Sequence, residues 1–140
     1  MHAKTTRFGV SLDAELLERF DRHIQRRHSR NRSQALGDLI RQALVEEEWA
    51  DTHNQVMGTV TVVYDHHVRE LTDRLTDLQH RYHDRIISAL HVHLDHHNCL
   101  EVLVVRGRGA DVGDLVLRIR SLRGVKHATL SMTTTGAQLP

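Results

Sequence analysis

The sequence predicts an α+β protein in which one strand and two helices precede a βαββαβ unit. Two observations carry this prediction: a short N-terminal segment alternates apolar and polar residues, and after residue 55 the hydrophobic period switches repeatedly between two and about 3.6 residues. The 140 residues are 39% hydrophobic and 26% charged, which is typical of a globular protein. Neither an apolar run of about 20 residues nor an N-terminal signal segment is found, so we expect no membrane span and no secretion.

The first predicted element is a strand over residues 7–12. Phe8, Val10 and Leu12 alternate there with polar or small residues, which is the pattern of a half-buried strand. A single strand leaves its backbone N–H and C=O groups without a ladder. Pairing with the same strand of a second chain would satisfy them, so we expect an obligate dimer built on an intermolecular two-stranded ribbon.

Two amphipathic helices are expected after this strand. Asp13 is the predicted N-cap of the first helix, which runs to about Arg27. Ser33 is the predicted N-cap of the second helix, which runs to about Glu48 with apolar residues every three or four positions. The first module is therefore strand–helix–helix.

The remainder of the chain alternates between strand and helix patterns. Strands are predicted at residues 56–65, 86–94, 100–106 and 125–132, with helices from Val68 to His83 and from Val112 to Leu122. This βαββαβ order is the ferredoxin-like split βαβ arrangement. The expected organisation is a first module over residues 1–48, a linker over 49–54, a second module over 55–136 and a tail over 137–140.

Charge is distributed unevenly along the chain. Residues 1–45 hold nine Lys and Arg against five Asp and Glu, a balance of +4, whereas residues 46–140 hold ten against thirteen, a balance of −3. Four of the basic residues fall within seven positions, at the end of the first predicted helix and in the turn after it: Arg26, Arg27, Arg30 and Arg32. Such asymmetry favours a nucleic-acid partner for the first module.

The candidate DNA contacts are Arg7, Gly9 and Ser11 on the strand and Arg30, Arg32 and Ser33 at the turn. The major groove of B-DNA admits a two-stranded ribbon, in which Arg7 could donate two hydrogen bonds to guanine and Ser11 could bond to several bases. The N–H groups at the start of the second helix could anchor a phosphate. The alternative is an ordinary solvated strand face beside a charged turn.

Histidine is the unusual residue of this composition, with 13 copies, six of them within an 18-residue stretch. His91 and His93 are separated by one residue, so on a strand both imidazoles project from the same face. The intervening and flanking residues Leu90, Val92 and Leu94 are then expected to face the core. The alternative is a pair of surface histidines on a polar sheet face.

Cys99 is the only cysteine and follows a short turn after these histidines. It cannot form an intrachain disulfide, which favours a reducing cytoplasm. Two imidazoles and a thiolate disfavour calcium and magnesium and favour zinc, copper, nickel or cobalt. His80 and His83, on the preceding helix, are candidates for a fourth ligand.

The remaining clustered histidines, His66, His67, His96 and His97, are each expected to be solvent-exposed. No phosphate-binding glycine loop and no nucleophile elbow is found in the sequence. The best enzymatic alternative makes the two histidines and the cysteine a catalytic zinc site with an open position. That alternative does not explain the strand–helix–helix module, so we do not expect an enzyme.

The first module resembles the ribbon-helix-helix DNA-binding module. The second, with His80, His91-Val92-His93 and Cys99-Leu100-Glu101, resembles the regulatory domain of nickel-responsive repressors of the NikR family. The resemblance covers nearly the whole chain. It implies a cytoplasmic homotetramer, a dimer of dimers, which binds one Ni(II) per subunit and then represses nickel-uptake genes by holding operator DNA.

The resemblance also implies a set of metal ligands in square-planar geometry. They would be His91, His93 and Cys99 of one subunit and His80 of its neighbour, with Tyr64 and Glu101 holding the imidazoles from behind. A d⁸ ion with imidazole and thiolate donors favours such a plane, whereas zinc favours a tetrahedron. A regulator of the same build that senses cobalt, copper or a small molecule is the alternative.

Two positions depart from the family pattern. Gly9 stands where relatives often carry a side chain such as threonine, so one base contact should be missing. Some relatives hold potassium between the two domains with acidic residues early in the second helix. Asp38 matches one of these positions but Gln34 occupies another, which leaves an interdomain cation open.

Overall fold

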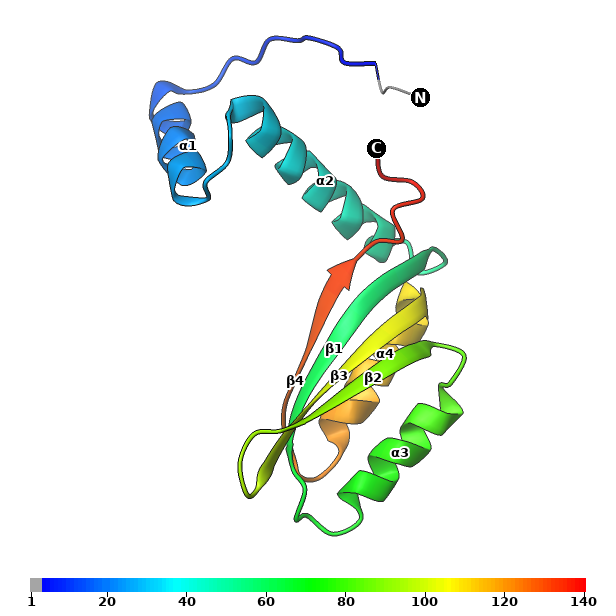
Figure 1. The fold of residues 1–140 in the computed structure, drawn as a ribbon. Helices are drawn as coiled ribbons and strands as arrows, with labels where there is room; N and C mark the ends of the chain where they lie inside the picture. Colours follow the sequence, from blue (N-terminus) through cyan, green and yellow to red (C-terminus); the bar gives the residue numbers. More distant parts are fainter. Residues whose placement is uncertain (1–3) are drawn as a thin grey trace. The chain divides into compact units, whose positions relative to one another are not determined.

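The computed structural model describes residues 4–140, and the chain divides into two compact units. The first unit ends at Ile40, and the second extends from Arg41 to Pro140. Figure 1 shows the helices of the first unit and, in the second, a sheet with its helices. Within the described residues, no helix combines the length and the apolarity that a membrane crossing requires.

The first helix, α1, spans Ala14–Arg26 and begins as the sequence predicts. The carboxylate of Asp13 accepts a hydrogen bond from the Leu16 N–H at 3.1 Å, which satisfies one of the unpaired donors of the first turn. Ile24 is the buried residue of this helix, so one face of α1 is packed while the rest is solvated.

The second helix, α2, spans Arg32–Ala50, and its cap differs from the prediction. The side chain of Asn31 accepts the N–H of Gln34 at 2.9 Å, so Asn31 is the capping residue. The prediction of Ser33 as the N-cap was wrong by two residues, and Ser33 lies in the first turn of the helix. The turn offers several residues able to cap, and the sequence pattern does not distinguish among them.

Residues 4–13 adopt no helix or strand in the single chain. Phe8, Val10 and Leu12 are 70%, 56% and 48% exposed, although they are the apolar side of the predicted strand. Within one chain no neighbouring strand supplies the ladder that this segment needs. The intermolecular ribbon therefore stays a prediction, and the exposed apolar side chains are what such a ribbon would bury.

The second unit has the predicted βαββαβ order. Its strands are β1 (Gln55–Asp65), β2 (Ile86–His93), β3 (Asn98–Arg108) and β4 (Val125–Thr133), and its helices are α3 (Leu71–Arg81) and α4 (Gly109–Ser121). All neighbouring strands are antiparallel, in the order β2-β3-β1-β4. The fold class predicted from the sequence is confirmed.

The core lies on one face of this sheet. Alternate residues of β1 and β3 are buried, as in the pairs Val60–Leu103 and Val62–Glu101. Leucines of α3 and the apolar stripe of α4 belong to the same buried cluster, so both helices cover this face. Figure 1 shows α3 and α4 on the same side of the sheet, so neither of them covers the opposite face.

The histidines of β2 lie on the helix-covered face. His91 is opposite Glu101 in the ladder, and His93 is opposite Cys99. The prediction that the apolar residues beside and between these histidines face the core was wrong. These residues occupy the uncovered face, with exposed fractions of 61%, 38% and 50% for Leu90, Val92 and Leu94. Alternation tells which residues share a face, but only the packing of the helices decides which face is inside.

The end of α2 extends into the expected linker. Trp49 and Ala50 are helical, so the first two residues of segment 49–54 continue the helix. The indole N–H of Trp49 donates to the carbonyl of Thr133 at 2.9 Å, and its ring lies close to Gly58. The tryptophan thereby fixes the end of α2 to β1 and β4.

Replacing Gly124 by alanine should lower the free energy of unfolding by more than about 1 kcal/mol, because its φ of +99° is strained for other residues. The added Cβ would also lie 2.7 Å from Leu71 Cδ2 and 2.9 Å from Val68 Cβ. Gly113→Ala is the matched control: it adds a Cβ with no atom within 4 Å and should raise helix stability. Equal urea midpoints for both variants would contradict this packing.

Candidate metal centre and DNA-binding surface

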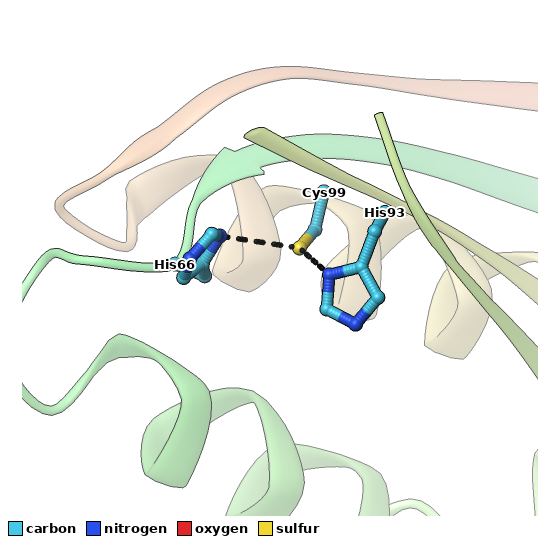
Figure 2. A group of neighbouring side chains, drawn as sticks. All are labelled: His66, His93 and Cys99. Atoms are coloured by element: carbon cyan, nitrogen blue, oxygen red, sulfur yellow. Dashed lines mark hydrogen bonds between the residues drawn. The ribbon is translucent and has the colours of Figure 1, made fainter. Parts of the chain in front are cut away.

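Three side chains that could hold a metal converge at one end of the sheet. Figure 2 shows His66, His93 and Cys99, with the Cys99 sulfur between the two imidazoles. The Sγ atom lies 3.4 Å from Nδ1 of His93 and 3.4 Å from Nδ1 of His66. The β2–β3 ladder places His93 opposite Cys99, and His66 comes from the loop directly after β1.

These distances suit a shared ion. A metal–sulfur bond of about 2.3 Å and a metal–nitrogen bond of about 2.05 Å put the two ligand atoms about 3.1 Å apart at a right angle and about 3.6 Å apart at the tetrahedral angle. The observed 3.4 Å lies between these two limits. The cluster could therefore take an ion with small side-chain movements, and its donors are those that nickel, zinc, cobalt or copper prefer.

The protonation of the cluster follows from its surroundings. Burial raises the pKa of the Cys99 thiol, and the negative charges of Glu101 and Asp95 raise it further. Desolvation lowers the pKa of His66, helped by the neighbouring imidazoles of His67 and His93. At neutral pH the sulfur is a thiol and His66 is a neutral imidazole with a lone pair available.

Metal binding at this cluster should release about one proton from the thiol per ion at neutral pH, because only the thiolate is a good ligand. The raised pKa of Cys99 places neutral pH below its titration, so apparent affinity should fall about tenfold for each pH unit lost. Calorimetry in buffers of different ionisation enthalpy counts the released proton. Binding without proton release would remove the Cys99 sulfur from the site.

His91 is held by a hydrogen-bonded chain rather than by the cysteine. Its Nδ1 lies 3.2 Å from the Tyr64 hydroxyl, which in turn lies 3.3 Å from Glu101 Oε2. When the tyrosine donates to the carboxylate, His91 must donate Nδ1–H to the tyrosine oxygen. Its lone pair is then on Nε2, on the other side of the ring, which is the arrangement that metal-binding histidines use.

Glu101 anchors this chain from inside the protein. It is 8% exposed and accepts a hydrogen bond of 2.6 Å from the side-chain amide of Gln79 on α3. Burial, together with the Glu101 charge, raises the pKa of Tyr64, so the phenol stays protonated and able to donate. The sequence pointed to Tyr64 and Glu101 but missed Gln79, because only the packing of α3 on the sheet brings its amide to the carboxylate.

The structure brings together part of the predicted ligand set. His93 and Cys99 are in contact, and the rings of His91 and His93 are 4.9 Å apart. His80 is exposed on α3 and is not part of the cluster of this chain. The expectation for His66 was wrong: it is half-buried against Cys99, since β1 ends beside the start of β3.

Comparisons with known proteins match both units. The family model described as "NikR C terminal nickel binding domain" matches residues 57–133, and "Ribbon-helix-helix protein, copG family" matches residues 6–47. Relatives from Nitratidesulfovibrio vulgaris (strain DSM 19637 / Miyazaki F) and Geobacter sulfurreducens (strain ATCC 51573 / DSM 12127 / PCA) are each 57% identical over 97% of this chain and 98% of their own. Both are provisionally named nickel-responsive regulators.

The chain belongs to the NikR family. It is a ribbon-helix-helix regulator with a nickel-binding domain, and the zinc-enzyme alternative is set aside because the family consists of transcription regulators. An uncharacterized protein from Thermotoga maritima shares the fold alone: it is 13% identical, with a TM-score of 0.53 over 58% of this chain and all of that one.

Among the residues predicted to contact DNA, Arg32 already has a side-chain partner. Arg32 forms a two-pronged pair with Asp21, with both nitrogen–oxygen distances at 2.8 Å. The hydrogen bond from Arg32 lowers the pKa of Asp21. To reach a phosphate, Arg32 would have to leave this partner, whereas the exposed side chains of Arg7, Ser11 and Arg30 need no such exchange.

The side chain of Gln34, where the resemblance leads us to expect an acidic residue, has a local hydrogen-bond partner. Its Oε1 accepts the backbone N–H of Arg30 at 2.8 Å. The glutamine therefore closes the turn before α2. This hydrogen bond gives Gln34 a role in the turn that requires no cation.

Proposed function

We propose that this chain is a nickel-dependent repressor that binds operator DNA in the cytoplasm when Ni(II) occupies a His₃Cys site. The observation that carries the proposal is the placement of His91, His93 and Cys99 on one face at one end of the sheet, with a buried carboxylate behind them. Family membership supports nickel as the ion and DNA as the target.

The proposed ligands are His91, His93 and Cys99 from one subunit and His80 from its neighbour. The hydrogen-bonded chain behind His91 supports its role, since it orients the ring and leaves Nε2 for the ion. The exposure of His80 on α3 supports a role toward another subunit. With imidazole and thiolate donors, Ni(II) would favour a square plane.

His66 is the competing candidate for a ligand position. It lies against the Cys99 sulfur, and desolvation and the imidazoles of His67 and His93 favour its neutral form. A set of His66, His93 and Cys99 would be open to a fourth ligand and would suit the tetrahedral geometry of zinc or cobalt as well as nickel. Both candidate ligand sets contain His93 and Cys99. Substituting a histidine that belongs to only one of the two sets will therefore show which set binds the ion.

We further propose a homotetramer formed as a dimer of dimers. The apolar residues of segment 7–12 support pairing through a ribbon, because they are exposed in one chain. The uncovered face of the sheet supports a second contact: Leu90 and Val92 adjoin Val102 and Leu100, which are only half-buried. Large exposed apolar surfaces of this kind usually mark an interface.

Nickel would regulate DNA binding by favouring one arrangement of the two ribbon-helix-helix pairs of the proposed tetramer. The shift in operator affinity must equal the difference in nickel affinity between the competent arrangement and the others. Coupling energies of this kind are typically about 1–3 kcal/mol, or about 5- to 150-fold in affinity. A ligand that crosses a subunit boundary, as proposed for His80, would provide such a difference.

The test is a nickel titration followed by absorption spectroscopy and by DNA retention, for the wild type, His80→Gln and His66→Gln. The proposal predicts that His80→Gln weakens nickel binding and abolishes nickel-dependent DNA retention, while His66→Gln retains both. The reverse pattern would support the His66 set. Retention with zinc or cobalt but not with nickel would assign the regulator to another metal.

A further inference from the structure

Trp49, the only tryptophan of the chain, lies in the last turn of α2. Its indole N–H donates to the carbonyl of Thr133, the last residue of β4, at 2.9 Å. The side chain is half-buried and packs against the buried apolar cluster of the second unit. The end of α2 therefore belongs to the packed core of the nickel-binding domain.

Two glycines leave space around this tryptophan. A Cβ added to Gly58, on β1, would lie 3.3 Å from Trp49 Cζ2 and 2.9 Å from the carbonyl oxygen of Ser131. A Cβ added to Gly109, at the start of α4, would lie 3.2 Å from the Trp49 carbonyl oxygen and 3.8 Å from its Cε3. With the hydrogen bond to β4, three elements of the second unit thus approach this one residue closely.

β1 connects the tryptophan contact to the candidate metal centre. Gly58 lies near the start of this strand, and Tyr64, whose hydroxyl lies 3.2 Å from Nδ1 of His91, lies near its far end. β1 is hydrogen-bonded to β3 on one side and to β4 on the other over most of its length. Rigid elements of this kind carry energetic coupling between distant sites.

α2 itself belongs to both units, since it begins at Arg32 in the first and ends at Ala50 in the second. Residues 51–54 join it to β1. Within this short loop the side-chain amide of Asn54 donates to the carbonyl of Glu48 at 3.3 Å. Without the indole contact, α2 could pivot on the loop while the sheet stayed in place.

We propose that Trp49 is a positioning residue that couples nickel binding to DNA binding by holding the end of α2 on the sheet. The inference rests on the proposed function. When nickel favours one arrangement of the subunits, a helix held in this way moves with its sheet, and so do the residues at its other end. A helix that pivots freely takes up several directions, so nickel changes operator affinity less. Trp49 is neither a proposed nickel ligand nor a predicted DNA contact, so its loss should affect the coupling and not nickel binding.

The test measures nickel affinity by absorption titration, and DNA retention with and without Ni(II), on the full chain. The probe is a duplex that the nickel-loaded wild type selects from a random-sequence pool. Trp49→Ala should keep the wild-type nickel affinity and thiolate band, while the nickel-dependent increase in DNA affinity falls from about 5- to 150-fold to less than about twofold. Trp49→Phe keeps a ring but removes the donor to Thr133, so its increase should lie between these values.

Glu47→Gln is the matched control, because it changes an exposed side chain of the same helix and should keep the wild-type increase. An equal loss in this control would overturn the specific role of the tryptophan. So would a wild-type increase in Trp49→Ala, or a loss of its nickel affinity, since the indole would then act through the fold of the metal domain. If circular dichroism shows that Trp49→Ala is unfolded, Trp49→Phe decides, and an increase equal to the wild type would overturn the proposal.

Failure of this inference can be told apart from failure of the proposed function. A wild type that binds nickel with no increase in DNA affinity would refute the proposed function and the coupling role with it. A wild type that responds to nickel, beside a folded Trp49→Ala protein that responds equally, would refute the coupling role alone.

Discussion

Replacing Cys99 by serine should weaken nickel binding by at least about 100-fold. Losing a residue that only hydrogen-bonds to a metal ligand typically costs about tenfold to 100-fold in affinity, and losing a ligand itself should cost more. A hydroxyl remains protonated and is a poor ligand for a borderline-soft ion. The thiolate charge-transfer band should vanish from the absorption spectrum. The nickel-dependent increase in operator affinity should vanish with it, since the ion can no longer favour one arrangement.

Tyr64→Phe is the control for Cys99→Ser, and we expect it to cause a smaller loss of nickel affinity. It keeps the sulfur and the ring, but it removes the hydroxyl that lies 3.2 Å from His91 Nδ1. We expect about a tenfold loss of nickel affinity with the thiolate band retained. Because Cys99 and Tyr64 are both buried, the circular dichroism and thermal midpoint of each variant should be compared with the wild type. A folded Cys99→Ser protein that keeps the band and stoichiometric nickel would refute the proposed centre.

Replacing Val10 by aspartate should abolish dimer formation and, with it, operator binding. Val10 is 56% exposed in one chain, and the proposed ribbon would bury it beside its copy in the second chain. Two unpaired carboxylates would then be desolvated in each dimer, at an effective cost of several kcal/mol per ion. Sedimentation analysis should show the loss of the ribbon contact, and a DNA-retention assay should show no specific complex.

Arg7→Ala separates DNA contact from assembly. In the predicted strand Arg7 lies on the side opposite Val10, so the variant should assemble normally. Its operator affinity should fall by about 1–3 kcal/mol for each lost guanine contact, with nickel binding unchanged. If Val10→Asp still forms the wild-type assembly, the ribbon is not an interface. If Arg7→Ala holds the operator as the wild type does, the ribbon does not read bases.

Much of the fold follows from local patterns. Asp13 caps α1 as expected, and the alternation of period in residues 55–133 predicts each element of the βαββαβ unit. These patterns are informative because side-chain period depends on backbone geometry, which each short segment expresses by itself. Where two neighbouring residues could play the same local role, as Asn31 and Ser33 could at the start of α2, the pattern was not sufficient.

The candidate metal site was likewise only partly predictable from the sequence. The spacing of His91 and His93 and the position of Cys99 after one turn predict a shared sheet end, and antiparallel pairing of β2 with β3 produces it. The contact of His66 with the sulfur has no sequence pattern, because it depends on the end of β1 lying beside the start of β3. The same holds for Gln79, which reaches Glu101 from a different element.

The sequence by itself determined the order of elements, the His-x-His pair and the residue types that suit a transition metal. Only the tertiary structure decided which face of β2 is inside: it put the histidines, and not Leu90 and Val92, on the helix-covered side. The physical reason is that alternation along a strand is symmetric between its two faces. The symmetry is broken only when distant helices pack on one of them.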